Sequence, residues 1–163
     1  MNEITVIGSV LHSKDWWDKA GEARINFING ASRTGEIYMT NVQTMVTRVT
    51  AAAEGDKVTR LNIIDHGDKN RAFFGQDCLT CDNFEKFAPV LGRLGSLFNT
   101  TSIVHLQHCE VGQNQDLLRM FAGTIGVAVY AGTGYHNSLL RENYGEYVRC
   151  SPSGTIYNNA ISP

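Results

Sequence analysis

Apolar residues recur along this chain in two rhythms, one typical of strands and one typical of helices. Helical spacing from Val42 to Ala53, with Gly55 as a stop, predicts one helix, and apolar positions from Leu117 to Ile125 predict another. Short runs rich in β-branched and other apolar residues predict strands at ITVIGSVL (4–11), RINFI (24–28), LNIID (61–65), SIVHLQH (102–108) and VAVYAG (127–132). The tail, GEYVRC then SPSG then TIYN, predicts a β-hairpin.

A further helical pattern covers residues 84–97. Asp82 with Glu85 three positions later predicts a capping box at its start. Pro89 lies inside the pattern, where it predicts a kink or a second helix start.

Strands that alternate with helices predict right-handed crossovers and a mainly parallel sheet. The expected fold is therefore an α/β three-layer sandwich with helices on both faces and a C-terminal β-hairpin. The 163 residues fit a single domain, 1–163.

The composition narrows the function classes. Fourteen basic residues against 16 acidic ones give no field of one sign, which disfavours nucleic acid and membrane partners. The first residues lack the pattern of a signal peptide, and no apolar run is long enough to span a membrane, so a cytoplasmic location is expected. Four cysteines are sparse for this length, which favours reduced thiols over a disulfide framework.

His66 and Cys109 occupy equivalent places in the pattern, 43 residues apart. Each follows a predicted strand, in LNIIDHG and VHLQHC, and each precedes a polar turn. The carboxyl ends of parallel strands share one edge of a sheet, and neighbouring strands are about 4.8 Å apart. We therefore expect the imidazole and the thiol to lie side by side.

Such a pair can perform acyl transfer. A cysteine attacks as the thiolate, and an imidazole serves as general acid for the leaving group. A helix beginning near Gln113 would add a positive dipole end near the sulfur. Backbone N–H groups of Gly67 and Cys109 are candidates for the oxyanion site.

The segments LNIIDHG and SIVHLQHC, with an amphipathic helix between them, resemble the catalytic half of the caspase-like cysteine peptidases, over about residues 58–132. That clan includes caspases, gingipains and self-processing toxin domains. Against the caspase signature Q-A-C-[RQG]-G, Gln107 and Cys109 are in register and Gly112 falls one position late.

The resemblance implies that Cys109 is the nucleophile, that His66 is the general acid and base, and that the Gly67 N–H binds the oxyanion. No cofactor is needed, and the implied partner is a peptide or protein substrate, with a homodimer or regulatory partner left open. Arg33 and Asp65 are candidate substrate contacts. The segment AGTGYHN (131–137), with Thr133 and Gly134, is expected to reach the same sheet edge and to form a wall of the cleft.

Two alternatives stay open. Cys78 and Cys81, with His108, have spacing that resembles a zinc site, which would make the chain a zinc-stabilised interaction module. A catalytically inactive caspase-like protein that binds a partner would keep the same fold.

Overall fold

A seven-stranded sheet forms the centre of the protein, seen in a computed structural model that describes residues 2–8, 36–137 and 142–163. Its strands, in spatial order, are β12 (Ile156–Ala160), β11 (Tyr147–Cys150), β8 (Ala128–Gly132), β7 (Phe98–Gln107), β3 (Val58–Ile64), β1 (Asn2–Gly8) and β2 (Glu36–Met39). The predicted strand at 24–28 and the end of the one at 4–11 lie outside the described residues.

Five of these strands form parallel pairs, and the last two, β11 and β12, pair antiparallel. Strands β2, β1, β3, β7 and β8 run in the same direction, whereas β11 pairs antiparallel with both β8 and β12. The mainly parallel sheet and the C-terminal β-hairpin are thus confirmed. The parallel strands follow the order 2-1-3-4-5 of doubly wound sheets, in which ligands bind beyond the carboxyl ends of the strands.

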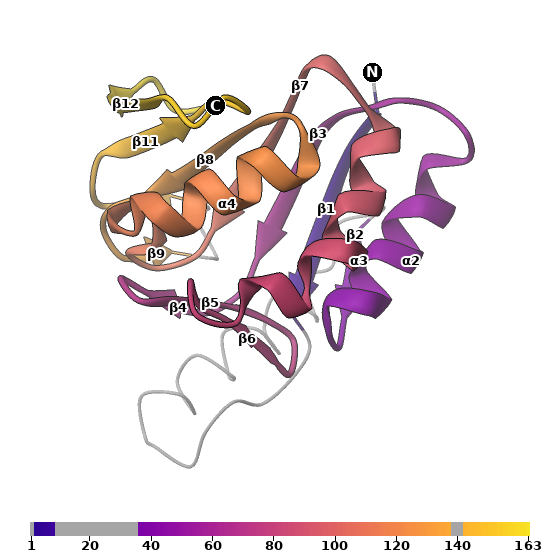
Figure 1. Ribbon diagram of the computed structural model, residues 1–163, viewed down its shortest axis with the longest axis horizontal. Coiled ribbons are helices and arrows are strands. Elements are labelled where there is room, and N and C mark those ends of the chain that lie inside the picture. The colour runs from indigo at the N-terminus through magenta and orange to yellow at the C-terminus, as the bar shows by residue number, and fades with distance from the viewer. Residues whose placement is uncertain (1, 9–35, 138–141) are drawn as a thin grey trace.

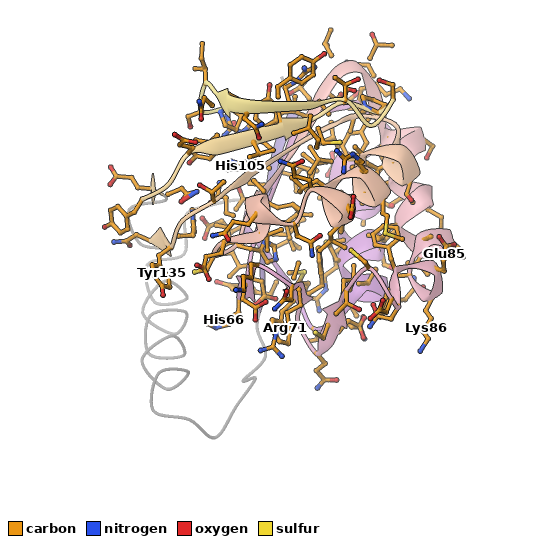
Figure 2. All side chains as sticks on the ribbon, turned by 60° about the vertical axis from the view of Figure 1, so that its left-hand side comes forward. His66, Arg71, Glu85, Lys86, His105 and Tyr135 are labelled. Atoms are coloured by element: carbon orange, nitrogen blue, oxygen red, sulfur yellow. The ribbon has the colours of Figure 1, made fainter. Side chains whose placement is uncertain are left out.

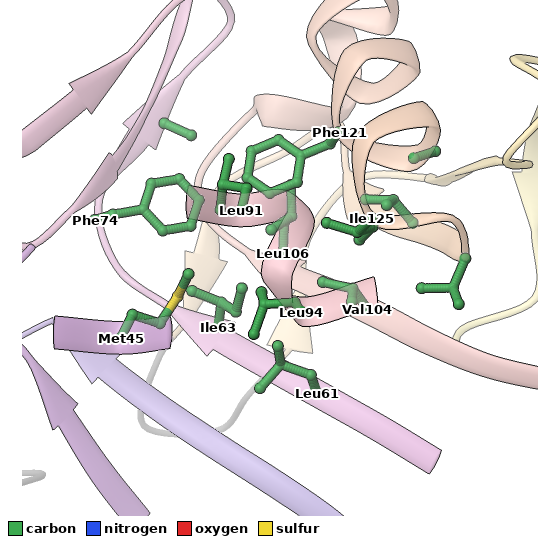
Figure 3. Packing of buried hydrophobic residues seen from close by; sticks show 14 of the residues in the cluster. Met45, Leu61, Ile63, Phe74, Leu91, Leu94, Val104, Leu106, Phe121 and Ile125 are labelled. Atoms are coloured by element: carbon green, nitrogen blue, oxygen red, sulfur yellow. The ribbon is translucent and has the colours of Figure 1, made fainter. Parts of the chain in front are cut away.

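The helices are α2 (Val42–Ala53), α3 (Ala88–Leu91) and α4 (Gln115–Ile125), together with the 3-10 helices η1 (Phe84–Lys86), η2 (Gly92–Leu97) and η3 (Val111–Gln113). Side chains from α2, α3 and α4 join one core with the inward residues of β3 and β7 (Figure 3). Figure 1 shows these helices together on one face of the sheet. A second helical layer is not found among the described residues, so that part of the three-layer sandwich stays a prediction. None of the described helices is long and apolar enough to cross a membrane.

Helix α2 begins at a capping box that the sequence pattern did not indicate. The Asn41 side chain accepts a hydrogen bond from Thr44 N–H at 2.8 Å, and the Thr44 hydroxyl oxygen accepts one from Asn41 N–H at 3.0 Å. The carboxylate of Asp77 accepts a third N–H, from Val42, at 2.9 Å. These bonds satisfy N–H groups that have no partner within the helix.

The predicted capping box between Asp82 and Glu85 is wrong. Asn83 occupies the N-cap position of η1, and it makes no side-chain capping bond. Its amide instead accepts a hydrogen bond from Thr80 N–H and donates one to the Cys78 carbonyl. The second start predicted at Pro89 is confirmed, because Pro89 lies in the first turn of α3, where its missing N–H has no cost.

Two small antiparallel sheets extend beyond the carboxyl edge of the main sheet. The first contains β4 (Gly67–Asp68), β5 (Arg71–Phe74) and β6 (Asp77–Leu79), and the second contains β9 (His136–Asn137) and β10 (Glu142–Asn143). A hydrogen bond of 2.7 Å from Gln76 N–H to the Thr40 carbonyl ties the first sheet to the start of α2. The two small sheets therefore flank the edge where His66 and Cys109 lie.

The face of the main sheet opposite α2, α3 and α4 carries a buried polar cluster. Gln107 and His105 from β7 lie beside Asn62 from β3, and the Gln107 amide nitrogen is 3.4 Å from the Asn62 carbonyl oxygen. The side chain of Arg60 donates to Asn62 at 2.9 Å. Asn62, His105 and Gln107 are buried and share these hydrogen bonds, although the Gln107 side-chain oxygen has no partner among the described residues.

Candidate functional site

The pairing of β3 with β7 aligns the two predicted catalytic residues. The last paired residues are Ile64 and Gln107, and both strands end there. His66 is two residues past Ile64, and Cys109 is two residues past Gln107. The two side chains thus start from matching positions on adjacent parallel strands, as the sequence predicts.

The carboxylate of Asp65 organises the turn that carries His66. Its two oxygens accept backbone hydrogen bonds from His66 N–H at 2.8 Å and from Gly75 N–H at 2.7 Å. The carboxylate is packed so closely on Gly8 that a Cβ there would lie 2.1 Å from it. Asp65 is 8% exposed, so its oxygens serve the protein interior, and its predicted substrate contact stays a prediction.

The N–H of Gly67 points away from its neighbouring strand. Phe73 N–H donates to the His66 carbonyl at 3.0 Å, and Gly67 and Ala72 form the next pair of this antiparallel ladder. Hydrogen-bonded and non-bonded pairs alternate in such a ladder, so the Gly67 N–H is directed outward from β5. In the described residues, β4 is an edge strand, and this N–H lies on its outer side.

Cys109 lies at the start of a tight turn between β7 and η3. Its sulfur accepts a hydrogen bond from His136 N–H at 3.4 Å, and the residue is partly exposed. Glu110, which follows it, has a φ of 57°, in the left-handed region that residues other than glycine rarely adopt. A hydrogen bond of 2.8 Å from Glu110 N–H to the Gly134 carbonyl holds this turn.

Gly112 lets the turn pack onto β8. A Cβ at this position would lie 2.7 Å from the carbonyl carbon of Gly132 and 2.8 Å from the oxygen of Ala131. Only glycine permits that approach of two backbones. The predicted helix then begins at Gln115, two residues past the expected Gln113, with η3 between it and Cys109.

The segment 131–137 contacts the Cys109 turn at the sheet edge where the sequence places it, and its role as a cleft wall stays a prediction. The Gln113 side chain donates to the Thr133 carbonyl at 2.7 Å. Thr133 is braced in turn by Glu146, whose N–H donates to the threonine hydroxyl at 2.9 Å. Gly134 N–H donates to the Asn143 side chain at 3.2 Å. Thr133 and Gly134 therefore support the turn with main-chain groups.

His136 is a site residue that sequence reasoning missed. It follows the end of β8 by four residues and contacts Cys109 through its backbone. The available signal was its place in a segment already expected at this sheet edge. A two-residue strand such as β9 has no periodicity that would have marked it.

His108 is buried beneath the His66 turn. It donates from Nε2 to the Phe73 carbonyl at 2.8 Å, and its ring lies 5.4 Å from that of Phe74. Burial lowers the pKa of His108 to about 3, although the bond to Phe73 acts in the opposite direction. The ring is therefore neutral at pH 7.

His105 lies on the opposite face of the sheet, with its ring 5.5 Å from that of Tyr147. Burial, assisted by the positive charge of Arg60, lowers the pKa of His105 to about 3. Figure 2 shows His66 and Tyr135 below His105 in the view. His105 is therefore part of the sheet interior and not of the site edge.

The structure does not bring the proposed zinc ligands into one group. Cys81 donates to the Asn114 side chain at 3.5 Å, at the start of α4, whereas His108 is engaged with Phe73. No cluster of three or more metal-ligating side chains occurs among residues 2–8, 36–137 and 142–163. Burial raises the pKa of the thiols of Cys78, Cys81 and Cys150. Arg33 lies outside the described residues.

Residues 18–136 match the family model described as "Domain of unknown function (DUF4347)", and the chain belongs to that family. No curated protein matches the chain. A 2.1 Å crystal structure of glycerol-3-phosphate dehydrogenase from Coxiella burnetii is similar at 12% identity and a TM-score of 0.33. That similarity covers 80% of this chain and 41% of the dehydrogenase, and it is too low to bear on fold or function.

Proposed function

We propose that this chain is a cysteine peptidase of the caspase-like type, with Cys109 as the nucleophile and His66 as the general acid and base. The observation that carries the proposal is the β3–β7 register, which ends at Ile64 and Gln107 and leaves both residues two positions further on. Because side chains alternate along a strand, an even count past the last paired residues favours the same side of the sheet for both residues. On adjacent parallel strands about 4.8 Å apart, such side chains would lie within the span of one bound peptide group.

The reaction follows from these roles. The Cys109 thiolate attacks the carbonyl carbon of the scissile bond, and a carbon–sulfur bond forms as charge moves to the oxygen. The carbon–nitrogen bond then breaks, and the leaving amine takes its proton from the His66 imidazolium. Water adds to the thioester and gives a proton to His66, after which the carbon–sulfur bond breaks and the carboxylic acid leaves.

The oxyanion would be bound by backbone N–H groups. The Gly67 N–H is directed away from β5 at the same edge, and the Cys109 N–H begins the turn at Glu110. Glycine at position 67 also permits close packing, because a Cβ there would lie 3.0 Å from the Cβ of His108. Two preorganised N–H donors are the usual arrangement for stabilising such an intermediate.

The sulfur of Cys109 is paired with the backbone of His136, whose carbonyl lies 3.9 Å away as an acceptor for the thiol and whose N–H is a donor to the sulfur. A hydrogen bond from His136 N–H to the sulfur at 3.4 Å is stronger when the sulfur carries a negative charge. The three other thiols lack this advantage, since burial raises the pKa of each of them. Cys109 should therefore be the most reactive thiol near neutral pH.

Alkylation of the native protein across a range of pH values, followed by mass spectrometry, tests this proposal. We expect iodoacetamide to modify Cys109 first at neutral pH, and His66→Gln to slow that reaction. His105→Gln is the matched control, because His105 is also a β7 histidine but is buried within the sheet, four residues before Cys109. Equal labelling of all four cysteines would contradict the dyad.

A peptidase assay completes the test. Purified protein should cleave members of a random peptide library, and Cys109→Ala should abolish cleavage while leaving the fold intact by circular dichroism. A reactive Cys109 with no cleaved peptide would favour the alternative of an inactive caspase-like protein that binds a partner.

A further inference from the structure

Two tyrosines are exposed beside the candidate nucleophile. Tyr135 is 68% exposed and Tyr144 is 67% exposed, values unusual for aromatic side chains. Tyr135 directly precedes strand β9, and Tyr144 directly follows strand β10. The Tyr144 N–H donates a hydrogen bond to the Tyr135 carbonyl at 3.0 Å. Large exposed aromatic groups next to a reactive centre mark a binding surface.

The two rings lie on the same face of this small sheet. The register pairs Asn137 with Glu142 and His136 with Asn143, so Tyr135 is opposite Tyr144. Side chains alternate, and directly opposed residues share a face. That face therefore presents Tyr135, Asn137, Glu142 and Tyr144, with a hydrogen bond of 3.0 Å between the Asn137 amide and the Tyr144 hydroxyl.

The alternate residues of the same sheet, His136 and Asn143, join it to Cys109 and to Gly134. Asn143 accepts hydrogen bonds from Gly134 N–H and Gly145 N–H, and His136 N–H donates to the Cys109 sulfur. Tyr135 and Tyr144 thus flank a small sheet that is hydrogen-bonded to Cys109, the candidate nucleophile, through His136.

The distance from Tyr135 to the sulfur is short enough for substrate contact. His136 N–H lies 3.4 Å from the sulfur, and the Tyr135 Cα is about 2.4 Å from that nitrogen along two bonds. The Tyr135 Cα is therefore within about 6 Å of the sulfur. An extended peptide advances about 3.3–3.6 Å per residue, so a side chain one or two residues from the scissile bond can reach the ring.

The negative charge near Tyr135 and Tyr144 would favour some substrate side chains over others. Glu142 lies two residues before Tyr144 on the same face, and Glu110 follows Cys109. Neither carboxylate forms an ion pair with a described residue, in contrast to Asp68, which is paired with Arg71 at 2.8 Å. The faces of the tyrosine rings are also electronegative and attract cations.

Resting on the proposed peptidase function, we propose that Tyr135, Tyr144 and Glu142 form a subsite for an arginine or lysine side chain of the peptide substrate, one or two residues from the scissile bond. The aliphatic stem packs on the rings, and the cationic group approaches the Glu142 carboxylate. An acidic side chain is repelled here, and a purely apolar one would desolvate the carboxylate without pairing it.

A pair of peptides that differ only by arginine or citrulline tests this subsite. Citrulline keeps the shape of arginine but has no charge. The cleavage sites found in the peptide library give the parent sequence, and kcat/KM is then measured for both peptides. We expect the arginine peptide to be favoured, and Glu142→Gln to reduce that preference about two- to fivefold with little change for the citrulline peptide.

Ring variants test the aromatic part of the subsite. Tyr135→Phe should keep the preference for arginine, whereas Tyr135→Leu should reduce it about two- to fivefold. Tyr157→Leu is the matched control, since Tyr157 is also exposed but lies on β12 at the edge of the main sheet. Circular dichroism establishes that each variant is folded.

The outcomes separate the two proposals. Cleavage that depends on Cys109 but shows the same kcat/KM for arginine and citrulline peptides, or a preference unchanged by Glu142→Gln and Tyr135→Leu, overturns the subsite and leaves the peptidase. Absence of any cleavage that depends on Cys109 overturns both.

Discussion

Acidification should destabilise this protein well before its carboxylates are titrated, because two histidines are buried in the neutral form. The pKa of each of His105 and His108 is about 3 in the folded protein, mainly as a result of burial. In the unfolded chain a histidine binds its proton near pH 6.5. Between these values the unfolded state holds more protons than the folded state, so the free energy of unfolding falls as pH falls.

The size of the effect follows from the same values. At pH 7.5 the unfolded histidines are almost all neutral, and the loss is negligible. At pH 5.0 the unfolded state gains about 2 kcal/mol per histidine, and about 4 kcal/mol for both. That is a large part of the roughly 5–15 kcal/mol typical of a folded domain.

Urea denaturation at constant ionic strength, between pH 7.5 and 5.0, measures this loss. His108→Gln is the chosen variant, because its amide can still donate to the Phe73 carbonyl but cannot titrate in this range. We expect the pH-dependent loss of His108→Gln to be about half that of the wild type, and His105→Gln should behave similarly. If wild type and both variants lose stability in parallel over this range, the two rings are not buried as described.

Three further changes test other parts of the structure. Asp65→Asn should destabilise the protein by about 1–3 kcal/mol, because the new side-chain NH2 group would face the N–H of His66 or Gly75 and could not accept a hydrogen bond from it. Amide hydrogen exchange at Gly75 should become faster, and unchanged exchange would refute the anchoring role of Asp65. Gly112→Ala should lower the free energy of unfolding, measured by urea denaturation, by about 1–3 kcal/mol. The control is Gly123→Ala in α4, where the nearest atom to a new Cβ is the Pro152 carbonyl oxygen at 4.0 Å, and this change should be neutral or stabilising. Equal effects of the two changes would argue against the close contact at Gly112. Asn41→Ala should lower the free energy of unfolding by about 1 kcal/mol through loss of the α2 cap, and a thermal midpoint that does not fall would contradict it.

The strands that carry the site were predictable because their patterns are unambiguous. A nearly continuous apolar run up to Asp65 and β-branched and apolar residues in SIVHLQH (102–108) mark two strands. The alternation with helices predicts that they run parallel. The helix from Gln115 was predictable because its apolar face repeats over three turns. Topology then makes the two strands neighbours, whereas the register that aligns His66 with Cys109 is seen only in the structure.

Other features depended on tertiary contacts that no local pattern records. The Asp82–Glu85 capping box failed because Asn83 is recruited by the preceding turn, where it bonds Thr80 and Cys78. Strand β2 has four residues and comes after the polar sequence NGASRTG (29–35), which leaves no periodicity to detect. The left-handed conformation of Glu110 has no signal either, because glycine or asparagine would be expected there.

The two halves of the candidate site are joined by residues 65–97, which contain the small sheet of β4, β5 and β6 and helix α3. Loop-closure entropy grows only slowly with length, and these residues form structure of their own, so this unit can form before the outer strands are in place. The β3–β7 pair should accordingly belong to the folding nucleus, and its amide hydrogens should be among the slowest to exchange. The alignment of His66 with Cys109 and the order in which the chain folds would then both depend on the hydrogen bonds between β3 and β7.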